Sequence, residues 1–235
     1  MRESDWLNPP FLSGQLEPLD WSQMGPDRLN KLENKPGIII RWFSDPWMKY
    51  EGEEKAAYGK WAKHVLDVCA RLFKKGVNIP LIGAAIARRE GKMGICTAVK
   101  EIEHEGKRGK NLDEMLILPE RASEQLDQQL YLLVEDAYEA LQHSQPVLWD
   151  IKAAQYVYGH PAGENGPDDF WLVDVGPEGI FGKKEKFDID RMVEFLDRLE
   201  GRVIILEQKF NVQLLKTREI IRRVYKELGT DPVSE

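Results

Sequence analysis

The first half of the chain alternates between short apolar runs and one segment of helical period. Residues 37–43 are β-branched and aromatic and are bounded by prolines, which predicts a strand. From 53 to 75 the apolar residues recur at helical spacing, and two lysines followed by Gly76 are typical of a helix end. Residues 79–87 and 93–102 predict two more strands, joined by a glycine-containing turn.

The second half is dominated by helical periodicity. Residues 121–143 form the clearest amphipathic pattern, with leucine, valine and alanine on one stripe. Two short apolar pieces follow at 146–149 and 170–173, separated by an insert rich in glycine and proline. The last third predicts a helix at about 188–199 and one or two helical segments across 201–228.

This order predicts an α+β fold, because strands and helices are segregated rather than alternating. Residues 1–30 are rich in Pro, Gly, Trp and polar residues and predict an irregular arm. Residues 31–103 then form a strand-rich half with one helix. A charged connector opens the mainly helical half, residues 104–235.

Composition narrows the functional classes. The 235 residues are 42% apolar with a formal net charge of −7, and no Lys/Arg stripe points to nucleic acid. The sequence contains no run of about 18 consecutive apolar residues, so no membrane span is predicted. Cys69 and Cys96 have apolar neighbours, which favours buried thiols and a cytoplasmic location. His104, His143 and His160 are expected in loops or at a helix end, too scattered to indicate a metal site.

Two short motifs carry candidate chemistry. Asp150, Lys152 and Gln155 lie within one polar turn that follows an apolar piece, and Asp174 precedes Gly176 after the next apolar piece. The first motif resembles the catalytic loop of protein kinases, in which an Asp is followed at fixed spacing by a Lys and an Asn. The second resembles the metal-binding Asp-Phe-Gly segment.

The resemblance implies a two-lobed protein-kinase-like fold that uses ATP and Mg²⁺. It is most similar to bacterial lipopolysaccharide-core sugar kinases and aminoglycoside phosphotransferases. In that template Asp150 would act on an acceptor hydroxyl, Lys152 would stabilise the migrating phosphoryl group, and Gln155 with Asp174 would hold the metal. Arg41 aligns best with the strand lysine that binds the nucleotide phosphates.

The sequence also departs from the kinase pattern. Trp149 stands where the catalytic loop has Arg, and Gln155 is one methylene longer than the expected Asn. No Gly-rich loop precedes the first strand, and the helix at 53–75 offers no glutamate at the position that would pair with a strand lysine. The missing Gly-rich loop and the missing glutamate both belong to the strand-rich half, which would bind the nucleotide, whereas the two aspartates are present.

Three interpretations therefore stay open. The first is an enzyme that transfers phosphate from ATP to a hydroxyl acceptor, such as a sugar or another small molecule. The second is a pseudokinase that keeps the fold as a binding or regulatory module without turnover. The third is an α+β interaction module whose Asp-containing turns have no catalytic meaning.

Overall fold

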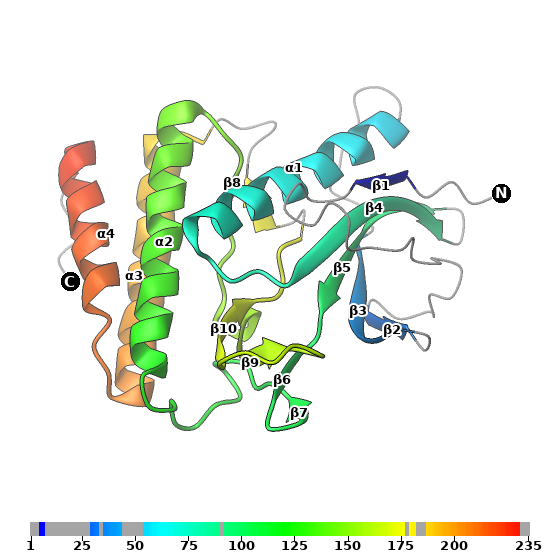
Figure 1. Ribbon diagram of the computed structural model, residues 1–235. Helices are drawn as coiled ribbons and strands as arrows, with labels where there is room; N and C mark the ends of the chain where they lie inside the picture. The colour runs from blue at the N-terminus through cyan, green and yellow to red at the C-terminus, as the bar shows by residue number, and fades with distance from the viewer. Residues whose placement is uncertain are drawn as a thin grey trace.

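The protein has a mixed α+β architecture, as the sequence predicts. The structure is a computed structural model, and it describes residues 5–7, 29–32, 35–43, 54–89, 92–176, 179–181 and 187–230. Figure 1 shows a strand-rich group of elements beside a helix-rich group. The helical group begins with α2, after the connector.

An antiparallel five-stranded sheet forms the first group, with the order β1-β4-β5-β3-β2. Its strands are β1 (Asp5–Leu7), β2 (Leu29–Leu32), β3 (Lys35–Phe43), β4 (Leu81–Arg89) and β5 (Lys92–Lys100). The strands expected at 37–43 and 79–87 thus lie in β3 and β4. Within the expected irregular arm, β1 pairs with β4. Apart from β1 and the start of β2, that arm lies outside the described residues.

Helix α1 (Glu54–Lys75) crosses the sheet and packs on β4 and β5 (Figure 1). Its apolar stripe is fully buried at Val65, Val68 and Leu72, which explains its orientation. The helix ends where the sequence predicts. Gly76 has a φ of +97°, and the next N–H groups bond back to carbonyls in the last turn.

A second, four-stranded sheet connects the two groups and has the order β10-β9-β6-β7. Its strands are β6 (Ile102–His104), β7 (Lys107–Arg108), β9 (Tyr156–Pro161) and β10 (Asp169–Leu172). The strand expected at 93–102 therefore breaks at Glu101. The break arises because the Glu101 N–H donates to Gly37 and its carbonyl accepts from Ala162, which redirects the chain.

Three long helices build the second group: α2 (Ala122–His143), α3 (Ile189–Phe210) and α4 (Leu215–Leu228). The helix expected at 188–199 does not stop there, because α3 runs through Gly201. Gly in a helix costs about 1 kcal/mol relative to Ala. Burial of Val203 and Leu206 on the same stripe as Leu199 offsets that cost. The two-stranded sheet of β8 (Val147–Leu148) and β11 (Ile180–Phe181) completes the fold.

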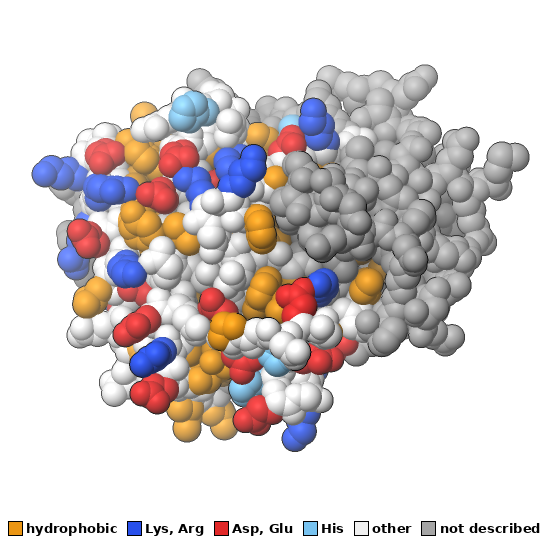
Figure 2. Space-filling model, viewed as in Figure 1, with side chains coloured by type: hydrophobic (Ala, Val, Ile, Leu, Met, Phe, Trp, Pro, Cys, Tyr) orange, Lys and Arg blue, Asp and Glu red, His pale blue; other side chains and the backbone are white. Residues whose placement is uncertain are grey.

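One hydrophobic core runs from α1 through α2 to α3 and α4. A bidentate ion pair also joins the first two helices, since Arg71 binds the buried Asp136 at 2.6 and 2.7 Å. Acidic and basic side chains are mixed over the helical group (Figure 2). Of the described helices, none is long and apolar enough to cross a membrane.

Candidate functional site

The turn that carries Asp150 is held by the β8–β11 pair. Directly after β8, the backbone N–H groups of Trp149 and Asp150 donate to the Gly179 carbonyl at 2.7 and 3.3 Å. The turn then closes in a short 3₁₀ helix, Ala153–Gln155, that leads into β9. These bonds present Asp150 at the end of a strand, which is the local geometry the sequence pattern predicts.

Gln155 ties this turn to the segment that carries Asp174. Its side chain is buried, and Oε1 accepts a hydrogen bond from the Lys152 N–H at 2.6 Å. Its Nε2 donates to the Asp174 carbonyl at 3.1 Å, and its own carbonyl accepts from the Val173 N–H at 2.9 Å. The amide therefore has a structural task at both ends, which sequence reasoning did not foresee.

Asp150 lies between two cations. The Lys152 ammonium forms an ion pair with Asp150 Oδ2, and the Arg202 guanidinium is 3.8 Å from Oδ1. Asp150 is about a quarter exposed, so its carboxylate remains open to solvent on one side. Arg202 comes from α3, far along the chain. No sequence pattern points to it, because it is one of several arginines on a helix surface.

Arg41 and Asp174 meet in an ion pair between the strand-rich and the helical groups. Arg41 comes from β3, and Asp174 follows β10. Each side chain is about a quarter exposed. A strand cation and a carboxylate from the other half of the chain are thus brought together.

All five residues singled out from the sequence form one connected chain of contacts. In order, the contacts join Asp150, Lys152, Gln155, Asp174 and Arg41. With Arg202 included, two cations pair with Asp150 and one with Asp174, so these ion pairs carry an excess of one positive charge on a protein of net charge −7. Such an excess favours an anionic ligand.

Trp149 is packed rather than free to act in the site. Its ring lies 6.3 Å from the Phe187 ring and 6.2 Å from the Phe195 ring, measured between centroids. The Arg198 guanidinium lies 5.0 Å from the centroid of the Trp149 ring, at the distance of a cation–π contact. Trp149 therefore anchors the turn on α3.

The histidines are less scattered than expected. His104 and His160 lie in paired strands, β6 and β9, and both bind Asp168 through Nδ1 at 2.6 and 2.7 Å. The expectation that these two histidines occupy loops is wrong. The glycines and prolines near them predict turns, whereas the pairing of β6 with β9 depends on residues far apart in the chain. Among the described ranges, no three His, Cys, Asp or Glu side chains are grouped to hold a metal ion.

Neither the protein-family models nor the curated proteins that were searched contain a match to this chain.

Proposed function

We propose that the protein is an atypical kinase-like phosphotransferase that uses ATP and Mg²⁺ to phosphorylate a hydroxyl group on a small molecule. The observation that carries this proposal is the connected chain of contacts from Asp150 to Arg41. It unites a candidate base, a candidate metal ligand and a strand cation from three separate segments.

The arrangement of elements supports a two-lobed kinase-like fold as part of the same proposal. An antiparallel sheet with one helix between β3 and β4 precedes the connector, as in the small lobe of kinases. Next come a long helix, a short strand, the Asp150 turn and the β9–β10 hairpin that ends near Asp174. This is the order that the resemblance to sugar kinases implies.

The residues present fit a magnesium ion that arrives with a nucleotide. Mg²⁺ is commonly held by one or two carboxylates together with phosphate oxygens and waters, so a dedicated protein cluster is not required. Asp174 supplies one carboxylate. Gln155 Oε1 keeps a second lone pair beside the one used by the Lys152 N–H. When bound, the ion would neutralise charge on the phosphates.

Each protein group has a separable task in this proposal. Asp150 orients the acceptor hydroxyl and takes its proton while the hydroxyl oxygen bonds to the γ-phosphorus of ATP, the bond from that phosphorus to the β–γ bridging oxygen breaks, and ADP leaves. Lys152 and Arg202, which pair with Asp150, offset the negative charge of the phosphoryl group that is transferred beside it. Arg41 would exchange its contact with Asp174 for the nucleotide phosphates, leaving the carboxylate for the metal. This exchange makes nucleotide binding and metal binding depend on each other.

A non-catalytic binding module is the second candidate, and the state of Gln155 favours it. Both ends of the amide are committed to backbone partners, so its oxygen is less available to a metal than that of a free side chain. Arg41 also cannot reproduce the compact ammonium of a lysine at the phosphates. A pseudokinase would retain the tie between the two loops and lose turnover.

Nucleotide binding is tested by thermal unfolding with ATP, with and without Mg²⁺. A ligand that binds only the folded state adds about 2.7 kcal/mol of stability at 100 times its Kd. We expect Asp174→Asn to abolish the Mg²⁺-dependent part of that gain. The exposed Asp113→Asn is the matched control and should behave as wild type. If the stability gained from ATP is the same with and without Mg²⁺, and the same in Asp174→Asn, then Asp174 does not bind the metal.

Turnover separates the two candidates. Asp150→Asn should slow phosphate transfer by about 10²-fold or more, within the range for positioned acid–base groups. Nucleotide affinity should stay near the wild-type value, because Asp150 faces the acceptor. If wild-type protein binds ATP but neither transfers phosphate to hydroxylated acceptors nor hydrolyses ATP above background, the pseudokinase is the better description.

A further inference from the structure

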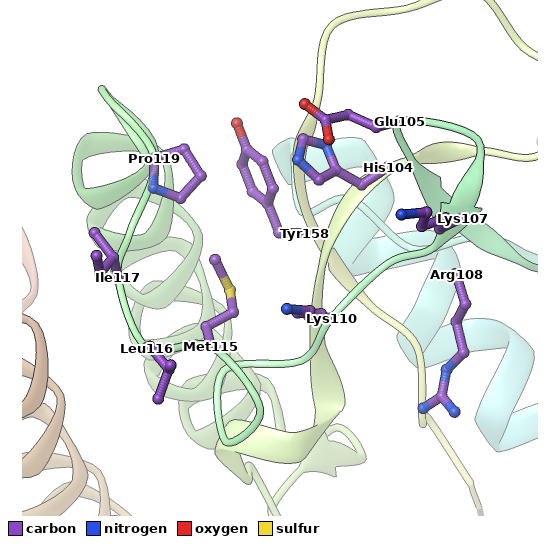
Figure 3. Close-up of a pocket in the computed structure, with 10 residues that line it drawn as sticks. All are labelled: His104, Glu105, Lys107, Arg108, Lys110, Met115, Leu116, Ile117, Pro119 and Tyr158. Carbon is purple, nitrogen blue, oxygen red and sulfur yellow. The ribbon is translucent and has the colours of Figure 1, made fainter.

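A groove of about 430 Å³ lies between the β6–β7 hairpin and the segment 111–119. None of the five candidate site residues lines it. Figure 3 shows the Tyr158 ring between the two walls, with Lys110 extending from the hairpin side toward Met115. Its volume falls in the range of about 300–1,000 Å³ that is usual for small organic ligands.

One wall of the groove is apolar and unusually open. Leu116 and Ile117 are 88% and 81% exposed, although they are adjacent and large. Met115 and Pro119 continue the same wall, with Met115 buried beneath it. Adjacent exposed apolar side chains beside a cavity are typical of a surface that is covered by a ligand.

The opposite wall carries positive charge. Lys107, Arg108 and Lys110 line it together with one carboxylate, Glu105, and Glu114 lies beside Arg108, so three cations against two anions leave a local charge of +1. Arg108 is 3.7 Å from Glu114 in an exposed pair. Among the described residues, no carboxylate lies within ion-pair distance of Lys107 or Lys110. On a chain of net charge −7, this local excess complements an anion.

Tyr158 can add a hydrogen bond. Burial raises the pKa of its phenol, and the nearby carboxylates of Asp168 and Asp169 raise it further. The hydroxyl therefore stays protonated at neutral pH and can donate a hydrogen bond at the end of the groove away from Lys110 (Figure 3).

The walls are held in place without a ligand. The Asn111 side chain accepts from the N–H groups of Asp113 and Glu114 at 2.9 and 3.0 Å. Lys209 on α3 donates to the Leu112 carbonyl at 2.7 Å. On the other side, the Lys110 carbonyl accepts from the Tyr158 N–H at 3.0 Å. A groove fixed from both sides loses little conformational entropy on binding.

We propose that this groove binds a small amphipathic anion, with its apolar body against Met115, Ile117 and Pro119 and its carboxylate or phosphate at Lys110. Lys107 adds longer-range attraction. The site is independent of the phosphotransfer proposal, since it uses different residues and a different pair of elements.

The probe is octyl phosphate below its micelle concentration, titrated into the full chain in a calorimeter. We expect saturable binding at one site. Octyl glucoside has the same apolar chain without the charge, and inorganic phosphate has the charge without the chain. Each should bind at least about 10-fold more weakly, because the groove recognises both parts. Raising the salt concentration should weaken the binding of octyl phosphate but not that of the uncharged octyl glucoside, through screening of the lysines.

Two variants identify the walls. Lys110→Gln and Ile117→Asn should each weaken octyl phosphate about 10-fold, and both side chains are exposed, so the fold should survive. Lys226→Gln, an exposed lysine in the last turn of α4, is the matched control and should have no effect. Asp174→Asn should also leave octyl phosphate binding unchanged, which separates this site from the nucleotide site.

Three results would overturn the proposal. If octyl glucoside binds as tightly as octyl phosphate, the groove does not recognise the negative charge. Wild-type affinity in Lys110→Gln would remove the assigned cation. Sedimentation with vesicles of phosphatidylglycerol and phosphatidylcholine, without saturable octyl phosphate binding, would instead make Leu116 and Ile117 part of a membrane-facing surface.

Discussion

At the scale of single residues, Asp168 has the most unusual surroundings outside the candidate site. One carboxylate binds His104 and His160 with its two oxygens. A carboxylate can only accept, so each imidazole must carry its proton on Nδ1. Burial alone would raise the pKa of Asp168, but the hydrogen bonds from His160 and His104 outweigh it and hold the pKa below its ordinary value.

This shift predicts how Asp168 contributes to stability as a function of pH. Because its folded-state pKa is depressed, Asp168 stabilises the fold above its ordinary pKa of about 3.9 and loses that contribution as the pH falls further. Asp168→Asn should therefore cost about 1 kcal/mol at pH 6. The difference from wild type should shrink as the pH falls below about 4, where the carboxylate becomes protonated. Urea unfolding across this range measures it.

Asp113→Asn is the control for Asp168→Asn, because Asp113 is exposed and forms no ion pair with any residue in the described ranges. It should leave the pH profile of stability unchanged. A difference between wild type and Asp168→Asn that stays constant down to pH 2.5 would show that the carboxylate charge is not what holds the two strands.

Two short motifs that resemble kinase motifs led to Asp150, Lys152, Gln155 and Asp174, and the alignment of one predicted strand led to Arg41. Their mutual contacts could not be predicted. The Arg41 contact with Asp174 spans most of the chain. The double role of Gln155 depends on where β10 ends, which the local sequence does not specify.

At the scale of elements, the start of α4 depends on a carboxylate from another helix. Asp127 on α2 accepts from the N–H groups of Lys216 and Thr217, each at 2.9 Å, and from the Thr217 hydroxyl at 2.7 Å. The residue that precedes α4, Leu214, has no side chain able to cap the helix. A negative charge at the positive helix end adds to these bonds.

Asp127→Ala should therefore destabilise the protein by about 3 kcal/mol, since it leaves the buried Thr217 N–H and the partly buried Lys216 N–H without their acceptor. The Thr217 hydroxyl keeps a second acceptor, the Asp127 carbonyl at 3.1 Å. Asp188→Ala removes the local cap of α3, where the carboxylate accepts from Arg191 at 3.1 Å, and should cost only about 1 kcal/mol. The free energies of unfolding of both variants, measured by heat and by urea, show whether a cap supplied by a neighbouring helix contributes more than a local cap. Equal losses would mean that Asp127 acts as an ordinary surface cap.

At the scale of the whole molecule, Gly37 marks the junction between the strand-rich group and the second sheet. Its φ is +81°, and a Cβ added there would lie 2.7 Å from the Cβ of Ala162. Glu101 bonds to both residues, accepting from Ala162 at 2.8 Å and donating to Gly37 at 2.7 Å. Three distant segments thus meet with no room for a side chain.

Gly37→Ala should cost at least about 2 kcal/mol, because it adds a close contact to an unfavourable backbone conformation. Gly163→Ala is a close match, since Gly163 has a φ of +77° but no heavy atom within 4 Å of an added Cβ. That control should cost only about 1 kcal/mol. The difference between the two variants in calorimetric unfolding measures the cost of the close contact between the added Cβ and Ala162. Similar losses would show that the junction yields to accommodate a methyl group.

The sequence by itself determined the α+β class, the ends of α1 and the local turn that presents Asp150. These features depend on hydrophobic period, glycine conformation and short polar spacing, all of which act over a few residues. Only the tertiary structure decided that Arg41 meets Asp174, that Arg202 approaches Asp150, and that two histidines share one carboxylate. Those contacts depend on how strands and helices far apart in the chain are packed together, and no local pattern contains that information.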